Sequence, residues 1–354
     1  MSTQQRIGLK ALAIGTTFLA PMGVALADVS LPPVTIGAGL RTSFTETHID
    51  DSAKSNSSDF SLDSARIYIN GTVTDNIKFM FDTEYSEANK NVNVIDAAAM
   101  FSLSDHVNIW AGRFLPPSDR ANLYGPYYAS NWGSFADGVQ DGYPFVAAGR
   151  DNGVMYWGQF GIMKVSFGAF GDPGLPKGSS DVLWAGRAQL DFWDPETGYY
   201  LNGSYYGEKD ILAVGVAAQN AVGKNACSAD FLLDKKLGNA GVVTVESEYA
   251  KYDGLGGYPP PGGATAAQSH GWYLLGAYLL PQPIGIGKVQ FLGKYGETNY
   301  RLAFSEIREP TTELDINYLI KGFNARVTLF FINQDYDHVV PGMRQVGVGL
   351  QVQM

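Results

Sequence analysis

The stretch QVGVGLQVQM (345–354) alternates throughout: every even-numbered position is apolar, and every odd-numbered position is Gln or Gly. An alternation with a period of two is typical of a β-strand that has one apolar and one polar face. About ten residues is also the length that one tilted strand needs to cross a membrane. The stretch therefore predicts a strand whose two faces meet different surroundings.

The same alternation recurs along the chain, for example in 65–73, 77–85, 243–249 and 311–320. Two architectures produce it. In a soluble β-sandwich the apolar faces form a core, whereas in an outer-membrane barrel they meet lipid and the polar faces line a lumen. Charged residues in mid-strand, strands longer than the usual length of about 5–6 residues, and connections that alternate between tight and long favour the barrel. We therefore predict an all-β protein, a transmembrane antiparallel β-barrel, with a secreted sandwich as the alternative.

The connections set the number of strands. The segment 199–218 is too long for one crossing, and GEKD (207–210) resembles a turn, but splitting the segment there gives an odd number of strands. Single-chain barrels of this type have even numbers, so we predict about sixteen strands, with fourteen or eighteen as alternatives. This assignment includes a tight connection at 193–198 and an external loop at 219–227. The predicted strands are 33–45, 61–74, 77–87, 93–103, 107–115, 152–159, 162–170, 181–193, 199–218, 228–237, 242–252, 270–280, 288–297, 311–321, 325–334 and 344–354.

Residues 1–27 have the features of a secretory signal peptide. Arg6 and Lys10 form a basic start, an apolar stretch follows, and Ala25 and Ala27 occupy positions −3 and −1 of a cleavage site. We therefore expect the mature domain, 28–354, to leave the cytoplasm and to insert as a barrel into the lipid of an outer membrane.

Composition excludes several other classes of protein. Charged residues make up 17% of the chain, against about 25% in a typical soluble domain. The formal net charge of −10 argues against a nucleic-acid partner, and the single cysteine, Cys227, excludes a disulfide framework. The four histidines are scattered, so we expect no metal site, no cofactor and no enzymatic activity. They are His48, His106, His270 and His338.

The loop 116–150 is the main functional candidate, because it carries seven aromatic residues. An exposed loop would gain little burial from ordering them. We therefore predict that it folds into the lumen and constricts it, with a cap or a contact to a neighbouring subunit as the alternative. The candidate residues in this loop are Asp119, Arg120, Tyr124, Tyr127, Tyr128, Trp132, Asp137 and Asp141.

Charged residues of both signs occupy positions of lumen parity on the predicted strands. Bases facing acids across a narrow pore would set up a transverse field that tunes ion selectivity. Alternatively, these charges pair with one another and are structural. The basic candidates for pore lining are Arg66, Lys78, Arg113, Arg187, Lys294 and Arg326.

Three stretches resemble a known superfamily: SARIYINGTVTDNIKFMFDTEY (64–85), VNIWAGRFLPPSDRANLYGPYY (107–128) and DFWDPETGYYLNGSYYGEKDILAVG (191–215). By these the chain resembles the Gram-negative porins, in the superfamily that includes the phosphate-selective porins. The resemblance implies a sixteen-stranded barrel, a homotrimer, and passive diffusion of small hydrophilic solutes or ions through a loop-constricted pore. It does not extend to anion selectivity, because the loop lacks the arginine ladder and lysine cluster of the phosphate-selective members. The chain also ends in Met354, where such barrels usually end in an aromatic residue.

Two other functions fit a barrel. It could be a sheath around a periplasmic partner protein, or an outer-membrane hydrolase that gathers catalytic groups from separate strands. Deleting the loop 116–150 separates the first from a porin, because a porin would then conduct more and a sheath would lose its partner.

Overall fold

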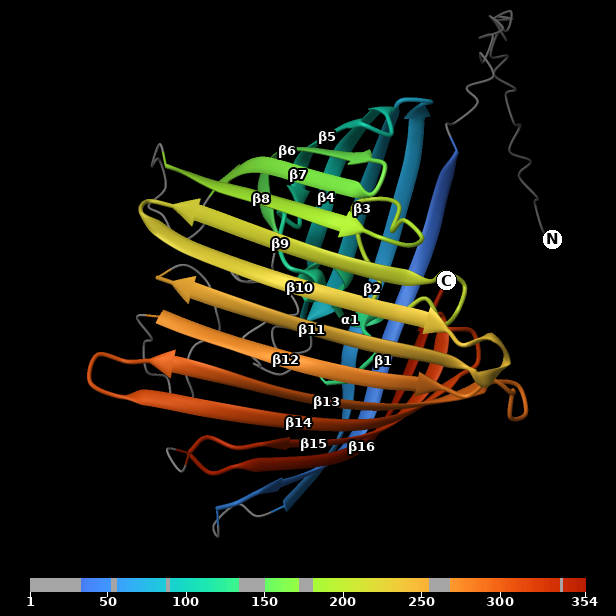
Figure 1. Cartoon of the computed structure of the whole chain (residues 1–354), viewed down its shortest axis with the longest axis vertical. Helices are drawn as coiled ribbons and strands as arrows, with labels where there is room; N and C mark the ends of the chain where they lie inside the picture. Colours follow the sequence, from blue (N-terminus) through green and yellow to red (C-terminus); the bar gives the residue numbers. More distant parts are fainter. Residues whose placement is uncertain are drawn as a thin grey trace, which may run out of the picture. The chain divides into compact units, whose positions relative to one another are not determined.

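Sixteen antiparallel strands close into a barrel, in which each strand pairs with its neighbours in the sequence and β1 pairs with β16 (Figure 1). This confirms the predicted fold class. The strands are β1 (Val34–Ile49), β2 (Asn56–Thr74), β3 (Ile77–Ser86), β4 (Asn91–Ser104), β5 (Val107–Phe114), β6 (Asp151–Phe160), β7 (Met163–Gly171), β8 (Val182–Asp191), β9 (Ile211–Ala221), β10 (Lys224–Lys236), β11 (Val242–Asp253), β12 (Gln268–Leu279), β13 (Lys288–Arg301), β14 (Glu306–Leu319), β15 (Ala325–Gln334) and β16 (Met343–Gln353).

The structure is a computed structural model that describes residues 33–51, 56–86, 90–133, 150–171, 181–254, 268–337 and 340–354. The signal peptide expected at 1–27 lies outside the described residues, and so does part of the loop 116–150. The described residues contain no helix that is both long and apolar enough to cross a lipid bilayer.

The last strand shows how the alternation maps onto the two faces of the wall. Val346, Val348, Leu350 and Val352 of β16 point outward and are 40–58% exposed, whereas their polar neighbours are turned inward. A β-sandwich would bury these apolar side chains in a core. Their exposure on the outer face is what a barrel in lipid requires.

The two ends of the barrel differ. The start of β1 and the end of β16 lie at the same end of the barrel, where the amide of Ala38 donates to the carbonyl of Met354 at 3.1 Å. The two-residue turn at 75–76 lies at the same end, because Val34 pairs with Gly71 just before it. We call this the terminal end, and the other, where the loop 116–150 leaves the wall, the loop end.

The prediction for 199–218 is wrong. The strand β9 begins only at Ile211, and residues 192–210 form one long connection at the terminal end rather than a tight turn at 193–198. The external loop predicted at 219–227 is instead a two-residue turn at Val222 and Gly223, where φ is 52° and 74°. Two positive φ angles fit the twist of a tight hairpin. The number of strands stays at sixteen because residues 199–210 join the connection and 211–221 still form one strand between β8 and β10.

Within the described residues, two short helices interrupt the pattern of strands. The helix α1 (Arg120–Tyr128) follows β5, and the 3-10 helix η1 (Gly238–Ala240) lies in the connection between β10 and β11. The carboxylate of Asp119 caps α1 by accepting from the amide of Asn122 at 2.8 Å. The helix kinks at Gly125, whose φ of 59° suits glycine and which precedes Pro126.

Candidate functional site

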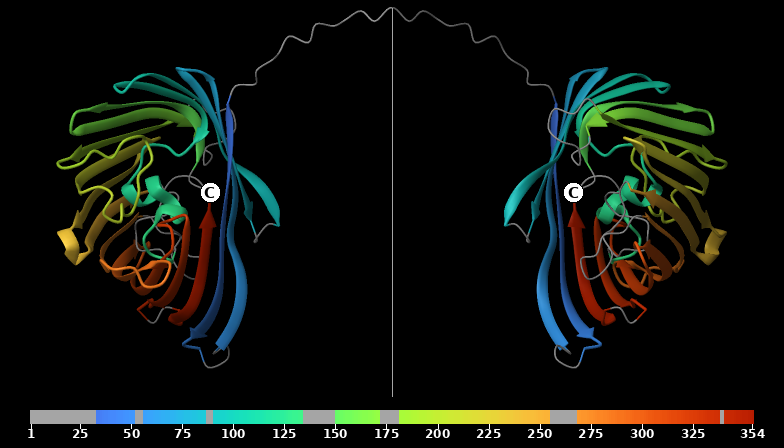
Figure 2. Two further views of the ribbon diagram at one scale, coloured as in Figure 1. Left: turned by 90° about the vertical axis from the view of Figure 1, so that its right-hand side faces the viewer. Right: turned by 90° about the vertical axis from the view of Figure 1, so that its left-hand side faces the viewer.

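Residues 115–133, here called the inner segment, cross the inside of the barrel (Figure 2). Near the start of the segment, Gln219 of β9 donates to the carbonyl of Pro117 at 2.7 Å. At its far end, Arg41 of β1 donates to the carbonyl of Trp132 at 2.9 Å. Since β1 and β9 lie on opposite sides of a sixteen-strand ring, the segment bridges the lumen.

The first turn of α1 is held by carboxylates of β11. The backbone amide of Ala121 donates to Glu248 at 3.2 Å, and the hydroxyl of Tyr124 donates to Glu246 at 2.8 Å. An exposed helix start would meet water at these positions. Here the wall of the barrel supplies the acceptors, which fixes the height of the helix in the lumen.

The end of the inner segment is held by β14 and β15. Glu313 accepts hydrogen bonds from the backbone amides of Trp132 at 2.9 Å and Gly133 at 2.6 Å. Arg326 donates to the carbonyl of Ala129 at 2.7 Å. Charge-assisted hydrogen bonds of this kind are stronger than neutral ones, so the segment is clamped at both ends.

The ring of Trp132 packs between two wall residues. The Arg41 guanidinium lies 4.3 Å from its centroid, and the Phe330 ring is stacked on it at 5.9 Å. This packing depends on glycines of β16, because a Cβ at Gly349 would overlap the Trp132 ring and a Cβ at Gly347 would overlap Phe330. The glycines that make the polar face of 345–354 are therefore the space into which these aromatic rings fit.

A second stretch, residues 196–206, enters from the terminal end and meets the inner segment; we call it the opposing segment. The amide of Leu201 donates to the carbonyl of Leu123 at 3.2 Å, and the amide of Gly203 donates to the carbonyl of Tyr128 at 2.9 Å. Backbone bonds thus join two segments that come from opposite ends of the barrel.

A buried cluster of charges locks this junction. The Arg120 guanidinium holds both carboxylate oxygens of Glu196, and Arg187 of β8 holds Asp230 of β10 at 2.8 Å. Arg120 also lies 3.6 Å from Asp230, so the two pairs form one cluster with almost no exposure to solvent. Burial by itself would raise the pKa of Glu196, but the charge and hydrogen bonds of Arg120 hold that pKa below its usual value.

Much of the lumen is filled by apolar side chains, which differs from the expected water-filled interior. Inward-facing Trp110, Phe170, Leu183 and Tyr273 are buried in one cluster with Leu123 of the inner segment. Alternation predicts polar residues at such positions, but in MKVSFGAFG (163–171) and VLWA (182–185) both faces carry apolar residues. The inner and opposing segments cover these residues and keep them from water.

Three of the candidate bases are buried anchors and do not face open water. Arg120, Arg187 and Arg326 are almost completely buried, and all donate to carbonyl or carboxylate oxygens inside the barrel. Their position matches the structural alternative given for these charges. Lys294 also points inward, with its Nζ 4.2 Å from the centroid of the Tyr273 ring.

The other candidates are divided among several positions. Arg66 and Lys78 face the lumen from β2 and β3, and Tyr128 keeps 40% exposure at the end of α1. Arg113 is not brought into the lumen: it follows the outward parity of Ile109 on β5, because its neighbour Phe114 takes the buried position. Asp137 and Asp141 lie outside the described residues.

Sequence reasoning missed the opposing segment and Glu196. Their stretch was assigned to a turn and a strand, although residues 192–206 carry six aromatic residues. The same criterion that singled out 116–150, a high aromatic content in a connection, would have identified it.

An open cavity of about 580 Å³ remains beside the inner segment. Trp132 and Pro126 form its inner wall, and hydroxyl and carboxylate groups of β1 and β2 form its outer wall. The polar wall residues include Ser43, Thr45, Thr47, Ser57, Asp59, Ser61, Asp63 and Ser64.

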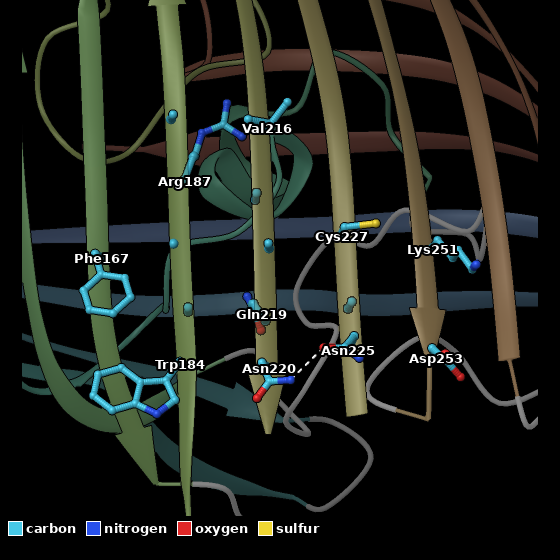
Figure 3. A pocket seen from close by; sticks show the side chains of 16 residues that line it. Phe167, Trp184, Arg187, Val216, Gln219, Asn220, Asn225, Cys227, Lys251 and Asp253 are labelled. Atoms are coloured by element: carbon cyan, nitrogen blue, oxygen red, sulfur yellow. Dashed lines mark hydrogen bonds between the residues drawn. The ribbon is translucent and has the colours of Figure 1, made fainter. Parts of the chain in front are cut away.

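A second cavity, of about 740 Å³, lies across the wall formed by β7 to β11 (Figure 3). Phe167 and Trp184 stack side by side at its rim, and both are strongly exposed on the outer face. Cys227 and Lys251 line its other side. Its rim faces outward, while inward-facing Arg187 and Gln219 line its inner side.

The buried carboxyl group of Asp119 should make the stability of the inner segment depend on pH. Burial raises its pKa to about 6, from an ordinary value near 3.8, while the hydrogen bonds from Asn122 and Ser118 oppose the shift. Ionised Asp119 is therefore unfavourable in the lumen above pH 6, and this cost disappears as the pH falls from about 6 to 4. We expect amides of α1 to be protected from hydrogen exchange up to about ten-fold more at pH 5 than at pH 7.5, after correction for intrinsic rates. Asp119→Asn should abolish this difference; an unchanged difference would assign it to another group.

The comparisons with known proteins bear on the fold. No protein-family model matches the chain, and no curated protein is similar to it. Solved structures do match. The outer membrane channel DcaP of Acinetobacter baumannii is 13% identical with a TM-score of 0.57, over 91% of this chain and 97% of that one. The anion-selective porin from Comamonas acidovorans is 14% identical with a TM-score of 0.53, over 91% and 99%. OmpT of Vibrio cholerae, in its trimer form, is 13% identical with a TM-score of 0.55, over 92% and 100%.

At these identities the likeness concerns the fold alone. The strand order is nevertheless complete in the described residues, and the matches span nearly the whole of each chain. The chain therefore has the fold of outer-membrane porins, a closed antiparallel barrel of sixteen strands.

Proposed function

We propose that the protein is a porin of the Gram-negative outer membrane, which lets small hydrophilic solutes or ions diffuse passively through a lumen narrowed by the inner segment. The observation that carries the proposal is the inner segment itself. It crosses the barrel from β9 to β1 and leaves a polar cavity beside it. A narrowed but not sealed lumen is the arrangement of a diffusion channel with a size limit.

The supporting arguments come from the outer face and from the comparisons. Exposed aliphatic side chains on the wall suit lipid, and the signal peptide expected at 1–27 would deliver the chain for insertion. Neighbours described as a channel, a porin and a trimer favour the same class of protein and a homotrimeric state. The apolar core and the opposing segment leave little room for a protein inside the barrel, which disfavours a sheath around a periplasmic partner.

Liposome swelling tests the proposal. Vesicles that contain the folded full-length protein should swell quickly in small neutral polyols, and the rate should fall steeply as the solute grows. Control vesicles with heat-denatured protein should not swell. Equal rates for every solute would contradict a narrowed lumen, and no swelling at all would contradict the porin function.

A further inference from the structure

The lumen is filled on one side only. On the inward faces of β7 to β11, charged residues such as Lys164, Asp230 and Glu246 are buried against the inner and opposing segments. On β2, by contrast, the inward-facing Asp59 and Asp63 are exposed. Water therefore reaches the wall at β2 and β3 and not the wall across the barrel.

At the loop end, this accessible wall borders the polar cavity. Ser61, Asp63 and Glu84 line the cavity on the side opposite Trp132. Ser43 of β1 donates to Asp63 at 3.0 Å, which places the carboxylate toward the inside of the barrel.

The same wall stays accessible toward the terminal end. Asn70 of β2 and Lys78 of β3 have inward parity and are exposed, as is Tyr128 on the facing side of α1. Between the two ends lies the pair of Arg66 and Glu84, with an N–O distance of 2.9 Å and a Glu84 side chain that is 26% exposed. Partly exposed polar side chains thus follow β2 from one end of the barrel to the other, while on β3 the inward-facing Met80 is buried between Lys78 and Asp82.

The charge along this wall is unbalanced. Arg66 is paired with Glu84 and its charge also reaches Asp82, while Arg41 is stacked on Trp132 and its charge reaches Asp63. Four inward carboxylates (Asp59, Asp63, Asp82 and Glu84) therefore face three bases (Arg41, Arg66 and Lys78) along β1 to β3, an excess of one negative charge. Among the described residues, no ion pair includes Asp59, Asp63 or Asp82. Lys78 near the terminal end is the base that faces them from β3. Negative potential in a narrow passage raises the local concentration of cations and lowers that of anions.

From this uneven filling and charge we infer that solutes cross the barrel along the wall formed by β2 and β3, and that Asp63 and Asp82 make this route prefer small cations to anions. The inference rests on the proposed porin function and adds to it the position of the route and the class of solute. It also sets this protein apart in selectivity from the anion-selective neighbour.

The zero-current potential across a planar bilayer with a KCl gradient tests the charge preference. The full-length wild type should give a potential of the sign that K⁺ selectivity produces, and the preference should grow in dilute salt, where charges are less screened. Asp63→Asn combined with Asp82→Asn should move the potential toward zero or reverse it. The matched control Asp105→Asn removes a carboxylate from the turn between β4 and β5, away from the route, and should leave the potential unchanged.

Cysteine labelling tests the route by an independent readout. In a Cys227→Ser background, Ser61→Cys should react with a positively charged thiol reagent, and the reaction should reduce the K⁺ current. Ala213→Cys, on the buried inward face of β9, should not react in the folded barrel. The inference would be overturned if the wild type conducts but its zero-current potential is the same in the variant Asp63→Asn with Asp82→Asn. It would also be overturned if labelling at position 61 leaves the K⁺ current unchanged. Either result would leave the porin function standing. A protein without conductance would overturn both.

Discussion

Replacing Arg120 by alanine should increase the single-channel conductance and the noise of the open channel. Arg120 is the only basic residue of the inner segment among residues 115–133, and it holds both oxygens of Glu196. Its removal takes the main charge partner from the buried Glu196 carboxylate and leaves Lys164 as the nearby base. Breaking a buried ion pair in this way typically costs about 3–5 kcal/mol. That cost falls on the junction of the two segments, so we expect them to separate while the wall of sixteen strands stays closed.

Two variants make this prediction specific. Arg344→Ala removes an ion pair with Asp50 that is about half exposed at the loop end, where such pairs contribute about 0–1 kcal/mol. Its conductance should match that of the wild type. Arg120→Ala combined with Glu196→Gln removes both charges. Its conductance and open-channel noise should return part of the way to the lower wild-type values. Equal conductance of Arg120→Ala and wild type would show that the Arg120–Glu196 pair does not hold the segments in place.

The second large effect is expected from adding one carbon atom to β16. In Gly349→Ala the new Cβ would overlap the Trp132 ring, which is packed between Arg41 and Phe330. Overpacking of this kind typically costs about 1–3 kcal/mol, and the ring, at the end of the inner segment, is easier to move than the wall. We expect Trp132 to leave its site. The tryptophan emission maximum should then shift to the red, toward that of exposed tryptophan, and the conductance should increase.

The matched control is Gly276→Ala on β12. This glycine points outward, and a Cβ there meets no atom within 4 Å. Conductance and tryptophan fluorescence should both stay at wild-type values. If Gly349→Ala also keeps the wild-type conductance and fluorescence, the space at this glycine is not what holds the Trp132 ring and the end of the inner segment in place.

The sequence predicted the wall well because a barrel strand obeys a local rule. Period-two alternation places Val346 and Val348 outward whatever happens elsewhere in the chain, and the order of the strands follows from antiparallel neighbours. The rule fails where both faces of a strand are apolar, as in 163–171, because alternation does not reveal that an inner segment will cover the inner face. It also fails at 199–210, whose tyrosines resemble a strand but pack inside the lumen.

The site was only partly predictable because its contacts join distant parts of the chain. The aromatic content of 116–150 pointed to an inward position, and the described part of that loop lies there. Parity alone, however, cannot distinguish a base that faces water, such as Lys78, from one that is buried, such as Arg187. That difference depends on Asp230 and on the carbonyl of Ser118, which approach Arg187 only in the folded barrel.

Recording single channels of the purified full-length protein in a planar bilayer is the most direct test of the central claim, that a water-filled route passes the inner segment. We predict discrete conductance steps for the wild type, and larger steps for the variants Arg120→Ala and Gly349→Ala. A correctly folded barrel that inserts but gives no steps in any of the three forms would contradict the claim.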